Sequence, residues 1–494
     1  MAAAAQSGLP SIEALFAKEP DRLSRLTRDV AGVYFDWSKT HLTHAIVEEY
    51  LSRAETTGFA AARDALFAGE VVNPSEGRAA THTAERGSGA PDDVELAMAR
   101  HRHTRALIDA IEAGAFGDVT GVLHIGIGGS VLGPALLVDA LGRSRSNLKV
   151  RFLSNIDGAA FEEAVEPLDP ATTLAVVVSK TFTTAETLAN MDAALGWLRS
   201  AGVSDALGRV IAVTARPEAA VQAGIDDTRV LQLAESIGGR YSLWSSVGIS
   251  AALALGWDAF EELLEGAAEM DRHFQFTDGA ENMPLLAAIA DRFYVEQQGC
   301  QARAIFPYDE RVRLLPSYLQ QLEMESNGKS VRGDGSPVEH PTAAVTWGGT
   351  GTDAQHAVFQ LLHQGTLLVP VEFVAIAEGE DSQAPDHRRQ LLLNAFAQGA
   401  ALMEGRASDD PQRANFGNRP SATILIDRLE PRALGALLAF YEHRTFANAV
   451  LLGINPFDQF GVELGKAIAR QLSDGTDEAD LDPSTRALIE RAGL

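Results

Sequence analysis

Cysteine is almost absent from this chain, since Cys300 is the only one among its 494 residues. A single thiol excludes an intramolecular disulfide framework and a cysteine-rich metal site. The 12 histidines are scattered and form no HExxH motif, so no metal site is expected. This composition fits a reducing, cytoplasmic location.

Long apolar runs are also missing. The longest, such as Leu174–Val178 and Leu367–Val371, have the length of a strand, well short of the roughly 20 residues of a membrane helix. The N-terminus, Met1–Gly8, has neither a basic flank nor a long apolar region, so no signal peptide is expected. We therefore expect no membrane partner.

Positive charge is scarce, because 41 Lys and Arg face 67 Asp and Glu and leave a net charge of −26. Such a field repels phosphate backbones, so nucleic acid is not expected as a partner. A small anionic substrate stays open where local cations and backbone amides outweigh the overall field. The 46% hydrophobic and 22% charged residues are typical of a soluble globular protein and exclude global disorder.

The secondary-structure signals predict an α/β protein of several domains. Residues 1–115 read as a mostly helical region, and from residue 121 short apolar runs alternate with helical segments. This alternation indicates βαβ units and parallel sheets covered on both faces. We expect two αβα sandwich domains, at 116–275 and 276–455, followed by a C-terminal helical segment at 456–494. The first strands are expected at Gly121–Ile125, Val150–Leu153, Leu174–Val178 and Val210–Val213.

A glycine-rich turn, Gly126–Pro134, follows the first expected strand. Free amides and a helix N-terminus at such a turn suit an anion. A dinucleotide fingerprint would need a third glycine where Val131 stands, and a Walker loop would need Lys-Ser/Thr after Gly133, so both are excluded. A turn that serves only close packing of strand and helix is the alternative.

A second polar turn, Ser179–Thr184, follows the strand Leu174–Val178 and precedes the expected helix Ala185–Leu198. It offers four hydroxyls and one ammonium group at the carboxyl end of a parallel strand, where ligands of α/β sheets bind. This set suits a compact phosphate dianion. The alternative is a helix cap provided by Thr184.

Two segments carry candidate catalytic charges. Arg240 follows two glycines and precedes an expected apolar helix, Leu243–Leu255. Its guanidinium could stabilise a developing oxyanion, and a structural ion pair is an equally good interpretation. The stretch Gln321–Gly328 reads as a helix that stops at Asn327-Gly328. Glu325 then lies in the last turn, where the negative end of the helix dipole disfavours an ionised carboxylate and suits a general base. Gln321 shares its face, whereas Glu323 is expected to point into solvent.

Two further helices carry a histidine and a lysine. A helix is expected at 352–364, capped by Thr352 or Asp353 and closed by Gly365. It places His356 in its first turn, where the positive end of the helix dipole favours neutral imidazole. A histidine that serves only in packing is the alternative.

The stretch from Pro456 is expected to be helical to Leu472 and places Gln459 and Lys466 on one face. Its two glycines, Gly461 and Gly465, each cost about 1 kcal/mol in a helix, which indicates that another backbone or a ligand approaches closely. A surface pair of Lys466 with Glu463 is the alternative.

Together these segments resemble the glucose-6-phosphate isomerase (phosphoglucose isomerase) family from about residue 70 to 470. The matching stretches are Asn73–Ala79, Gly126–Pro134, Ser179–Thr187, Gly238–Gly248, Phe306–Asp309, Gln320–Lys329, Gly351–Gly365, Phe416–Pro420 and Gly453–Lys466. The stretches around Arg240 and Gly461-Val462-Glu463 look like the family's signature patterns.

The resemblance implies two sugar-isomerase (SIS) αβα domains in a homodimer that completes its active sites across the interface. The activity it implies belongs to glycolysis and gluconeogenesis and needs no metal or redox cofactor. Glu325 matches the base that moves a proton between C1 and C2, Arg240 the group that steadies the enediolate, and His356 and Lys466 the groups that assist ring opening. The histidine reaches in from the neighbouring subunit. The matched substrate-binding residues are Gly129, Ser130, Ser179, Lys180, Thr181 and Thr184 for the phosphate, with Gln321 and Gln459 as further substrate contacts.

Three departures from the family pattern remove no residue with a chemical role. Val131 stands where most members carry Asp, Asp353-Ala354 replaces Asn-Gly, and His124 replaces Asn. Two alternatives stay open: an isomerase of another sugar phosphate, including one that accepts both glucose and mannose 6-phosphates, and a non-catalytic module that senses sugar phosphates.

Overall fold

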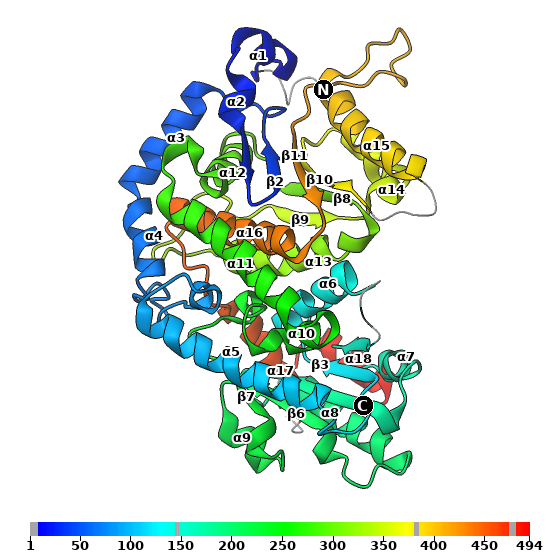
Figure 1. Cartoon of the computed structure of the whole chain (residues 1–494). Coiled ribbons are helices and arrows are strands. Elements are labelled where there is room, and N and C mark those ends of the chain that lie inside the picture. Colours follow the sequence, from blue (N-terminus) through cyan, green and yellow to red (C-terminus); the bar gives the residue numbers. More distant parts are fainter. Residues whose placement is uncertain (1–7, 144–145, 147, 380–384, 474–480) are drawn as a thin grey trace. The chain divides into compact units, whose positions relative to one another are not determined.

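The computed structural model describes residues 8–143, 146, 148–379, 385–473 and 481–494. The chain divides into two compact units, Met1–Pro456 and Phe457–Leu494. The first unit holds two β-sheets and the helices that cover them (Figure 1). Within the described ranges, no helix is long and apolar enough to cross a membrane.

The first sheet has five parallel strands in the order β4-β3-β5-β6-β7. Its central strands are buried along their whole length, which explains their unbroken apolar sequences. Helices α7, α8 and α9 pack on one face around a single apolar core. The elements are β3 (Gly121–Ile125), α6 (Leu132–Leu141), β4 (Lys149–Leu153), α7 (Gly158–Val165), β5 (Thr173–Val178), α8 (Ala185–Ser200), β6 (Val210–Thr214), α9 (Pro217–Gln222) and β7 (Val230–Gln232), so the expected strands of this region are confirmed.

The strand order gives this sheet a switch point between β3 and β5. The chain leaves β3 for β4 on one side and returns to the other side of β3 as β5. In open α/β sheets, ligands bind in the crevice at the carboxyl ends of strands where the order reverses. The glycine-rich turn after β3 and the Ser179–Thr184 turn after β5 flank that crevice.

The second sheet has six strands in the order β1-β2-β11-β10-β8-β9. The strands β8 to β11 are parallel, and β2 runs antiparallel to β11. The fold is therefore α/β with mainly parallel sheets, as predicted. The elements are β8 (Ala302–Tyr308), α13 (Leu315–Leu319), β9 (Val345–Gly348), α14 (Gly351–Gln364), β10 (Val371–Glu378), α15 (Pro385–Glu404) and β11 (Ser421–Arg428).

The N-terminal region contributes a hairpin to this sheet as well as helices. Strands β1 (Thr27–Val30) and β2 (Val33–Asp36) are joined by Ala31 and Gly32 at φ of 55° and 76°, as a type I′ turn requires. The helices of this region are α1 (Ile12–Lys18), α2 (Arg22–Leu26), α3 (His44–Thr56), α4 (Phe59–Phe67) and α5 (Pro91–Glu112). Ser11 caps α1 as its sequence predicts, since its hydroxyl accepts a hydrogen bond from the Ala14 amide at 3.3 Å.

Long central helices pack between the sheets. Helix α16 (Pro431–Leu452) is almost entirely buried and lies against α11 (Trp257–Phe276), with α10 (Ile249–Leu255) and α12 (Met283–Arg292) alongside. The crossing of α11 and α16 needs glycines on both helices. A Cβ at Gly266 would lie 1.8 Å from the Arg432 carbonyl oxygen, and one at Gly435 would lie 2.0 Å from that of Leu263.

Two expected helix boundaries are wrong. The helix after Arg240 begins at Ile249 rather than Leu243, because two short 3₁₀ turns come first. Helix α14 begins at Gly351 after Thr350, two residues before the first expected cap, Thr352, so His356 lies in its second turn. Its end at Gly365 is confirmed.

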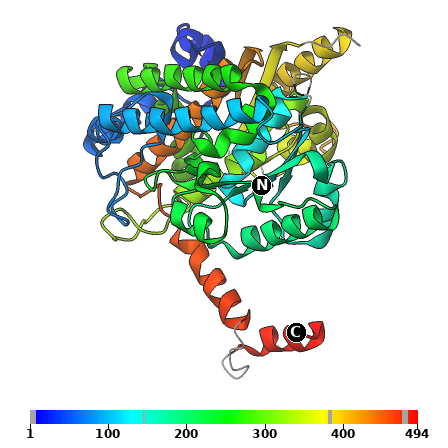
Figure 2. The same ribbon diagram turned by 60° about the horizontal axis from the view of Figure 1, so that its bottom comes forward.

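The C-terminal unit contains α17 (Glu463–Ser473) and α18 (Pro483–Ala492), seen as separate helices in Figure 2. The stretch from Pro456 is therefore not one continuous helix, since a short 3₁₀ turn at Phe460–Val462 precedes α17. A Cβ at Gly461 or Gly465 meets no described atom within 4 Å.

Candidate active site

The two polar turns meet at the switch point. A Cβ at Gly126 would lie 3.2 Å from the Val178 carbonyl oxygen, so the glycine-rich turn runs directly past the end of β5. In the second turn, the Ser179 hydroxyl donates to Thr184 Oγ1 at 3.2 Å. Thr184 precedes α8, yet its side chain caps no helix amide. The simple capping alternative is therefore wrong.

A buried histidine fixes the backbone of the glycine-rich turn. His124 Nε2 lies 2.7 Å from the Ser130 carbonyl oxygen, and Nδ1 lies 2.8 Å from Ser250 Oγ. Burial lowers the pKa of His124 to about 4, so the ring is neutral at pH 7. Because a carbonyl can only accept, Nε2 carries the proton and Nδ1 accepts from the Ser250 hydroxyl.

The glycine-rich turn also touches the segment that carries Arg240. A Cβ at Gly129 would lie 2.2 Å from the Gly239 carbonyl carbon and 2.5 Å from the Arg240 amide nitrogen. Gly128, at φ of 59°, lies against Gln321, whose Nε2 would be 2.8 Å from a Cβ there. The turn after β3 is thus in contact with two other predicted site segments.

Lys180, in the Ser179–Thr184 turn, is partly buried. Its Nζ donates to the carbonyl oxygens of Glu235 at 2.7 Å and Ile237 at 2.9 Å. Burial and the positive charge of Arg78 lower its pKa to about 8. Lys180 is therefore mainly charged at pH 7 and loses that charge in mildly alkaline solution.

Arg240 and Glu325 approach each other from different segments. Arg240 is buried, and its Nη1 lies 3.6 Å from Glu325 Oε2. The guanidinium also donates from Nε to Ser326 Oγ at 2.7 Å, donates to the Pro456 carbonyl oxygen, and lies over the Tyr241 ring. These contacts fix Arg240 while Glu325 stays partly accessible, with 22% of its side chain exposed.

The segment with Glu325 is a π-helical turn at Gln320–Glu325, not the α-helix expected from the sequence. Turns of this kind are rare and occur often at functional sites. The expectation that Glu323 points into solvent is also wrong. Glu323 is buried and pairs with Arg303, because the turn lies directly on the second sheet.

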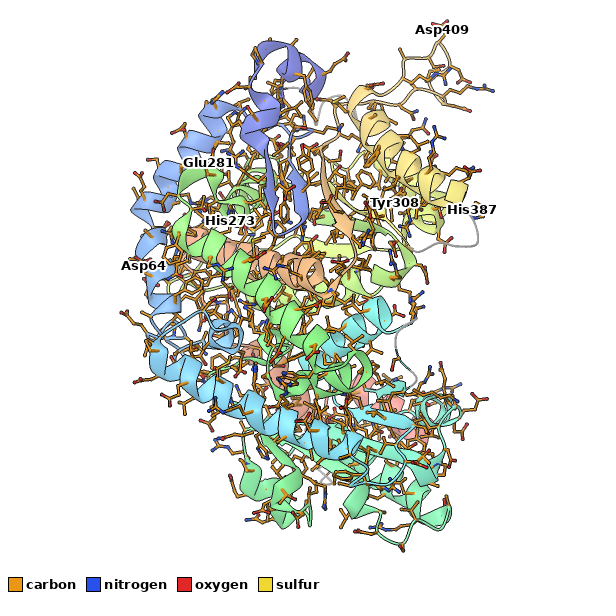
Figure 3. All side chains as sticks on the ribbon, in the orientation of Figure 1. Asp64, His273, Glu281, Tyr308, His387 and Asp409 are labelled. Atoms are coloured by element: carbon orange, nitrogen blue, oxygen red, sulfur yellow. The ribbon has the colours of Figure 1, made fainter. Side chains whose placement is uncertain are left out.

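His356 is exposed on α14. The residue before it, Gln355, connects α14 to the second sheet. The Tyr308 hydroxyl at the end of β8 (labelled in Figure 3) donates to Gln355 Oε1 at 2.9 Å. Gln459 and Lys466 belong to the C-terminal unit. Lys466 is exposed there and pairs with Glu463 at 3.1 Å, the surface pair that the sequence left open.

Arg78 lies beside Lys180, a position that its sequence does not predict. Arg78 Nη1 donates to the Glu235 carbonyl oxygen at 3.0 Å, the same oxygen that accepts from Lys180. Glu76 pairs with Arg78. In the sequence, Asn73–Ala79 stands out only by its family resemblance. Arg78 is about 100 residues from Lys180 along the chain, so their contact cannot be predicted from spacing.

The structure is thus an α/β protein in which two turns suited to binding an anion lie beside an arginine and a carboxylate. The family model described as "Phosphoglucose isomerase" matches residues 36–489. A glucose-6-phosphate isomerase of Rhizorhabdus wittichii is 63% identical over 98% of this chain and 96% of its own, and one of Zymomonas mobilis is 56% identical over 98% and 95%. The crystal structure of a glucose-6-phosphate isomerase from Chlamydia trachomatis superposes with a TM-score of 0.90 at 31% identity, covering 99% of this chain and 98% of its own. The chain belongs to the phosphoglucose isomerase family.

Proposed function

We propose that this chain catalyses the reversible isomerisation of glucose 6-phosphate and fructose 6-phosphate, by ring opening and proton transfer through a cis-enediolate. The observation that carries the proposal is the pair of Arg240 Nη1 and Glu325 Oε2, 3.6 Å apart beside the two polar turns. The family membership and the named relatives favour this substrate pair over the other sugar phosphates and over a sensing module.

The phosphate binds at the switch point. Lys180 supplies a cation, and hydroxyls with free amides complete the set for a dianion. The phosphate is remote from the reacting carbons, so its binding energy serves to hold the open chain in place. The residues that we assign to this role are Gly129, Ser130, Ser179, Lys180, Thr181 and Thr184.

Glu325 removes the proton from the carbon next to the carbonyl and returns it to the neighbouring carbon. One carboxylate serves both halves, because the proton moves only between adjacent atoms. Arg240 offsets the negative charge that develops on the enediolate oxygen, and its own hydrogen bonds preset its position before the reaction. Gln321 and Gln459 contact the substrate.

Ring opening requires proton transfer to the ring oxygen and from the anomeric hydroxyl. We assign these transfers to His356 and Lys466, each contributing a factor of about 10²–10⁴. We also propose a cytoplasmic homodimer in which His356 acts in the partner's site. The exposed face near His356 supports it, since Leu361 on α14 and Leu393 and Phe396 on α15 present apolar side chains to solvent. The domain boundaries at 115, 275 and 455 are part of the same proposal.

The activity is tested by offering fructose 6-phosphate to protein freed of metal by a chelator and assaying glucose 6-phosphate. Turnover with fructose 6-phosphate and none with mannose 6-phosphate is the expected result. Turnover of both substrates would establish dual specificity, and binding without turnover would establish a sensor.

A further inference from the structure

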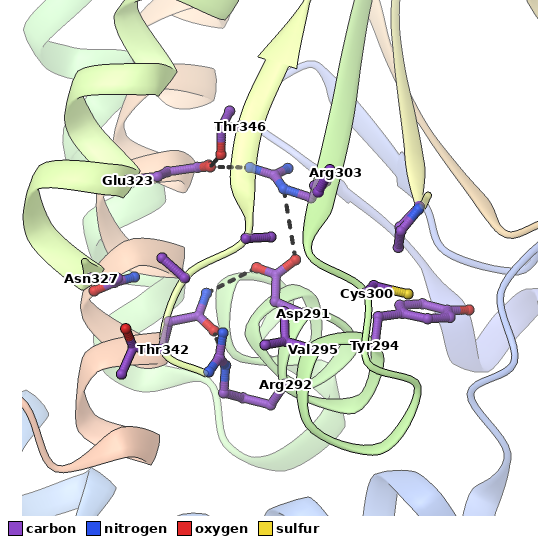
Figure 4. Close-up of a pocket in the computed structure, with 15 residues that line it drawn as sticks. Asp291, Arg292, Tyr294, Val295, Cys300, Arg303, Glu323, Asn327, Thr342 and Thr346 are labelled. Atoms are coloured by element: carbon purple, nitrogen blue, oxygen red, sulfur yellow. Dashed lines mark hydrogen bonds and ion pairs between the residues drawn. The ribbon is translucent and has the colours of Figure 1, made fainter. Parts of the chain in front are cut away.

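Glu323 lies on the same turn as Glu325, two residues earlier, and points in another direction. Residues two apart on a helical turn face nearly opposite sides. Glu325 faces Arg240, whereas Glu323 is buried and reaches toward the strands of the second sheet, as Figure 4 shows. The turn therefore presents one carboxylate to the site and one to the core.

The buried carboxylate ties the turn to two strands at once. Glu323 Oε2 accepts a hydrogen bond from Thr346 Oγ1 of β9 at 2.7 Å, and it pairs with Arg303 of β8. Charge-assisted bonds of this kind are stronger than neutral ones. Glu323 thus fastens the turn to two neighbouring strands of the sheet.

Charge balance does not explain why Glu323 is there. Arg303 also lies 3.3 Å from Glu372 and 3.9 Å from Asp291, and Arg444 contacts both of these carboxylates at 2.6 Å. Without Glu323 the cluster would still have two arginines and two carboxylates. Removing the charge of Glu323 therefore leaves no buried arginine unpaired, the situation that makes a broken ion pair strongly destabilising.

The second oxygen of Glu323 shares a small cavity with the side-chain oxygen of Asn327, at the far end of the turn. Glu323 Oε1 and Asn327 Oδ1 are buried acceptors without a hydrogen-bond partner among the described residues, and both residues line a cavity of about 30 Å³ (Figure 4). A polar space of that size has room for water, which can donate to both oxygens. The Asn327 amide donates to the Thr445 carbonyl oxygen of α16 at 3.2 Å, so this end is fastened as well.

We propose that Glu323 is a positioning residue for the isomerisation. Through Arg303 and Thr346, it holds the π-helical turn so that Glu325 stays opposite Arg240 and within reach of the substrate carbons. This inference rests on the proposed function, because it gives Glu323 a role only if Glu325 transfers the proton.

The test compares Glu323→Gln, which keeps an acceptor for Thr346, with Glu323→Met, which keeps neither bond. Thr346→Val is a milder variant that removes only the hydroxyl. For each, kcat and KM are measured with fructose 6-phosphate, together with the Kd of a hexitol 6-phosphate and amide hydrogen exchange across 320–327. Asp271→Asn is the control. Asp271 is a fully buried carboxylate that pairs with Arg86 and His443, and its helix, α11, carries none of the assigned site residues.

We expect kcat to fall about 10- to 100-fold in Glu323→Gln and further in Glu323→Met, because a shift of about 1 Å at the reacting groups can cost about 10²-fold. Hexitol phosphate affinity should change less than about threefold, since the phosphate turns belong to the other sheet, and exchange across 320–327 should quicken. The control should lose thermal stability but keep its kcat. If the other variants fail to fold, a small fall in kcat in Thr346→Val supports the positioning role, and an unchanged kcat contradicts it.

Wild-type kcat in Glu323→Gln and Thr346→Val, with Glu325→Gln inactive, would overturn the positioning role alone. Wild-type turnover in Glu325→Gln would instead overturn the proposed function, so the two failures are distinguishable.

Discussion

The partly buried lysine of the proposed phosphate site, Lys180, should make substrate binding sensitive to pH. With a pKa of about 8, Lys180 falls from about nine-tenths charged at pH 7 to about one-tenth at pH 9. A sugar phosphate stays a dianion over this range, because its second pKa is about 6. If the charged lysine is the form that binds, the Kd of a hexitol 6-phosphate should rise about tenfold between pH 7 and pH 9.

Isothermal titration at constant ionic strength measures this change directly. The charged neighbours of Lys180 are Glu76, Arg78, Glu235 and Arg240. Lys180→Arg supplies the control, because a guanidinium keeps its charge throughout and should flatten the pH dependence. Lys180→Met should bind weakly at both pH values. A wild-type Kd that is the same at pH 7 and pH 9 would refute the reasoning.

Three further predictions concern the two turns. Thr184→Ala should weaken hexitol phosphate binding about two- to tenfold while kcat at saturation changes less, and a reversed pattern would count against the phosphate site. Gly129→Ala should lower kcat about 10²-fold, since its Cβ meets backbone of Gly239 that cannot rotate away, whereas Gly196→Ala, with open space in α8, should retain activity. His124 should lower the free energy of unfolding as the pH falls below 6.5, the ordinary pKa of histidine. In the unfolded chain the ring takes up a proton below that pH, whereas in the folded chain it stays neutral until about pH 4. Thermal melts should then fall less steeply from pH 6.5 to pH 4 in His124→Asn, and parallel curves would contradict this.

The sequence predicted the parallel sheets well, because buried strands such as β5 are continuous apolar runs. It did not predict the hairpin β1–β2 within the mostly helical N-terminal region, because its turn places Ala31 at positive φ and lacks the usual Asn-Gly signal. The sheet's switch point follows from strand order, which the sequence does not state.

The candidate site was predictable as a set of segments but not as a geometry. The two turns were found from their hydroxyls and glycines, and the structure brings them together with Arg240, Glu325 and Gln321. Glu323 was misjudged because a charged residue on a helix is usually solvated, and its partner Arg303 stands 20 residues away in the chain. The π-helical turn was missed because the pattern of apolar residues does not distinguish it from an α-helix.

The most direct test follows hydrogen during the reaction. Fructose 6-phosphate is incubated in D₂O with wild-type protein and with Glu325→Gln, and deuterium at C2 of the glucose 6-phosphate and at C1 of the recovered ketose is measured by NMR. We predict incorporation by the wild type and none by the variant, which should still bind a hexitol 6-phosphate. Incorporation by Glu325→Gln at the wild-type rate would contradict the assignment of Glu325 as the group that moves the proton.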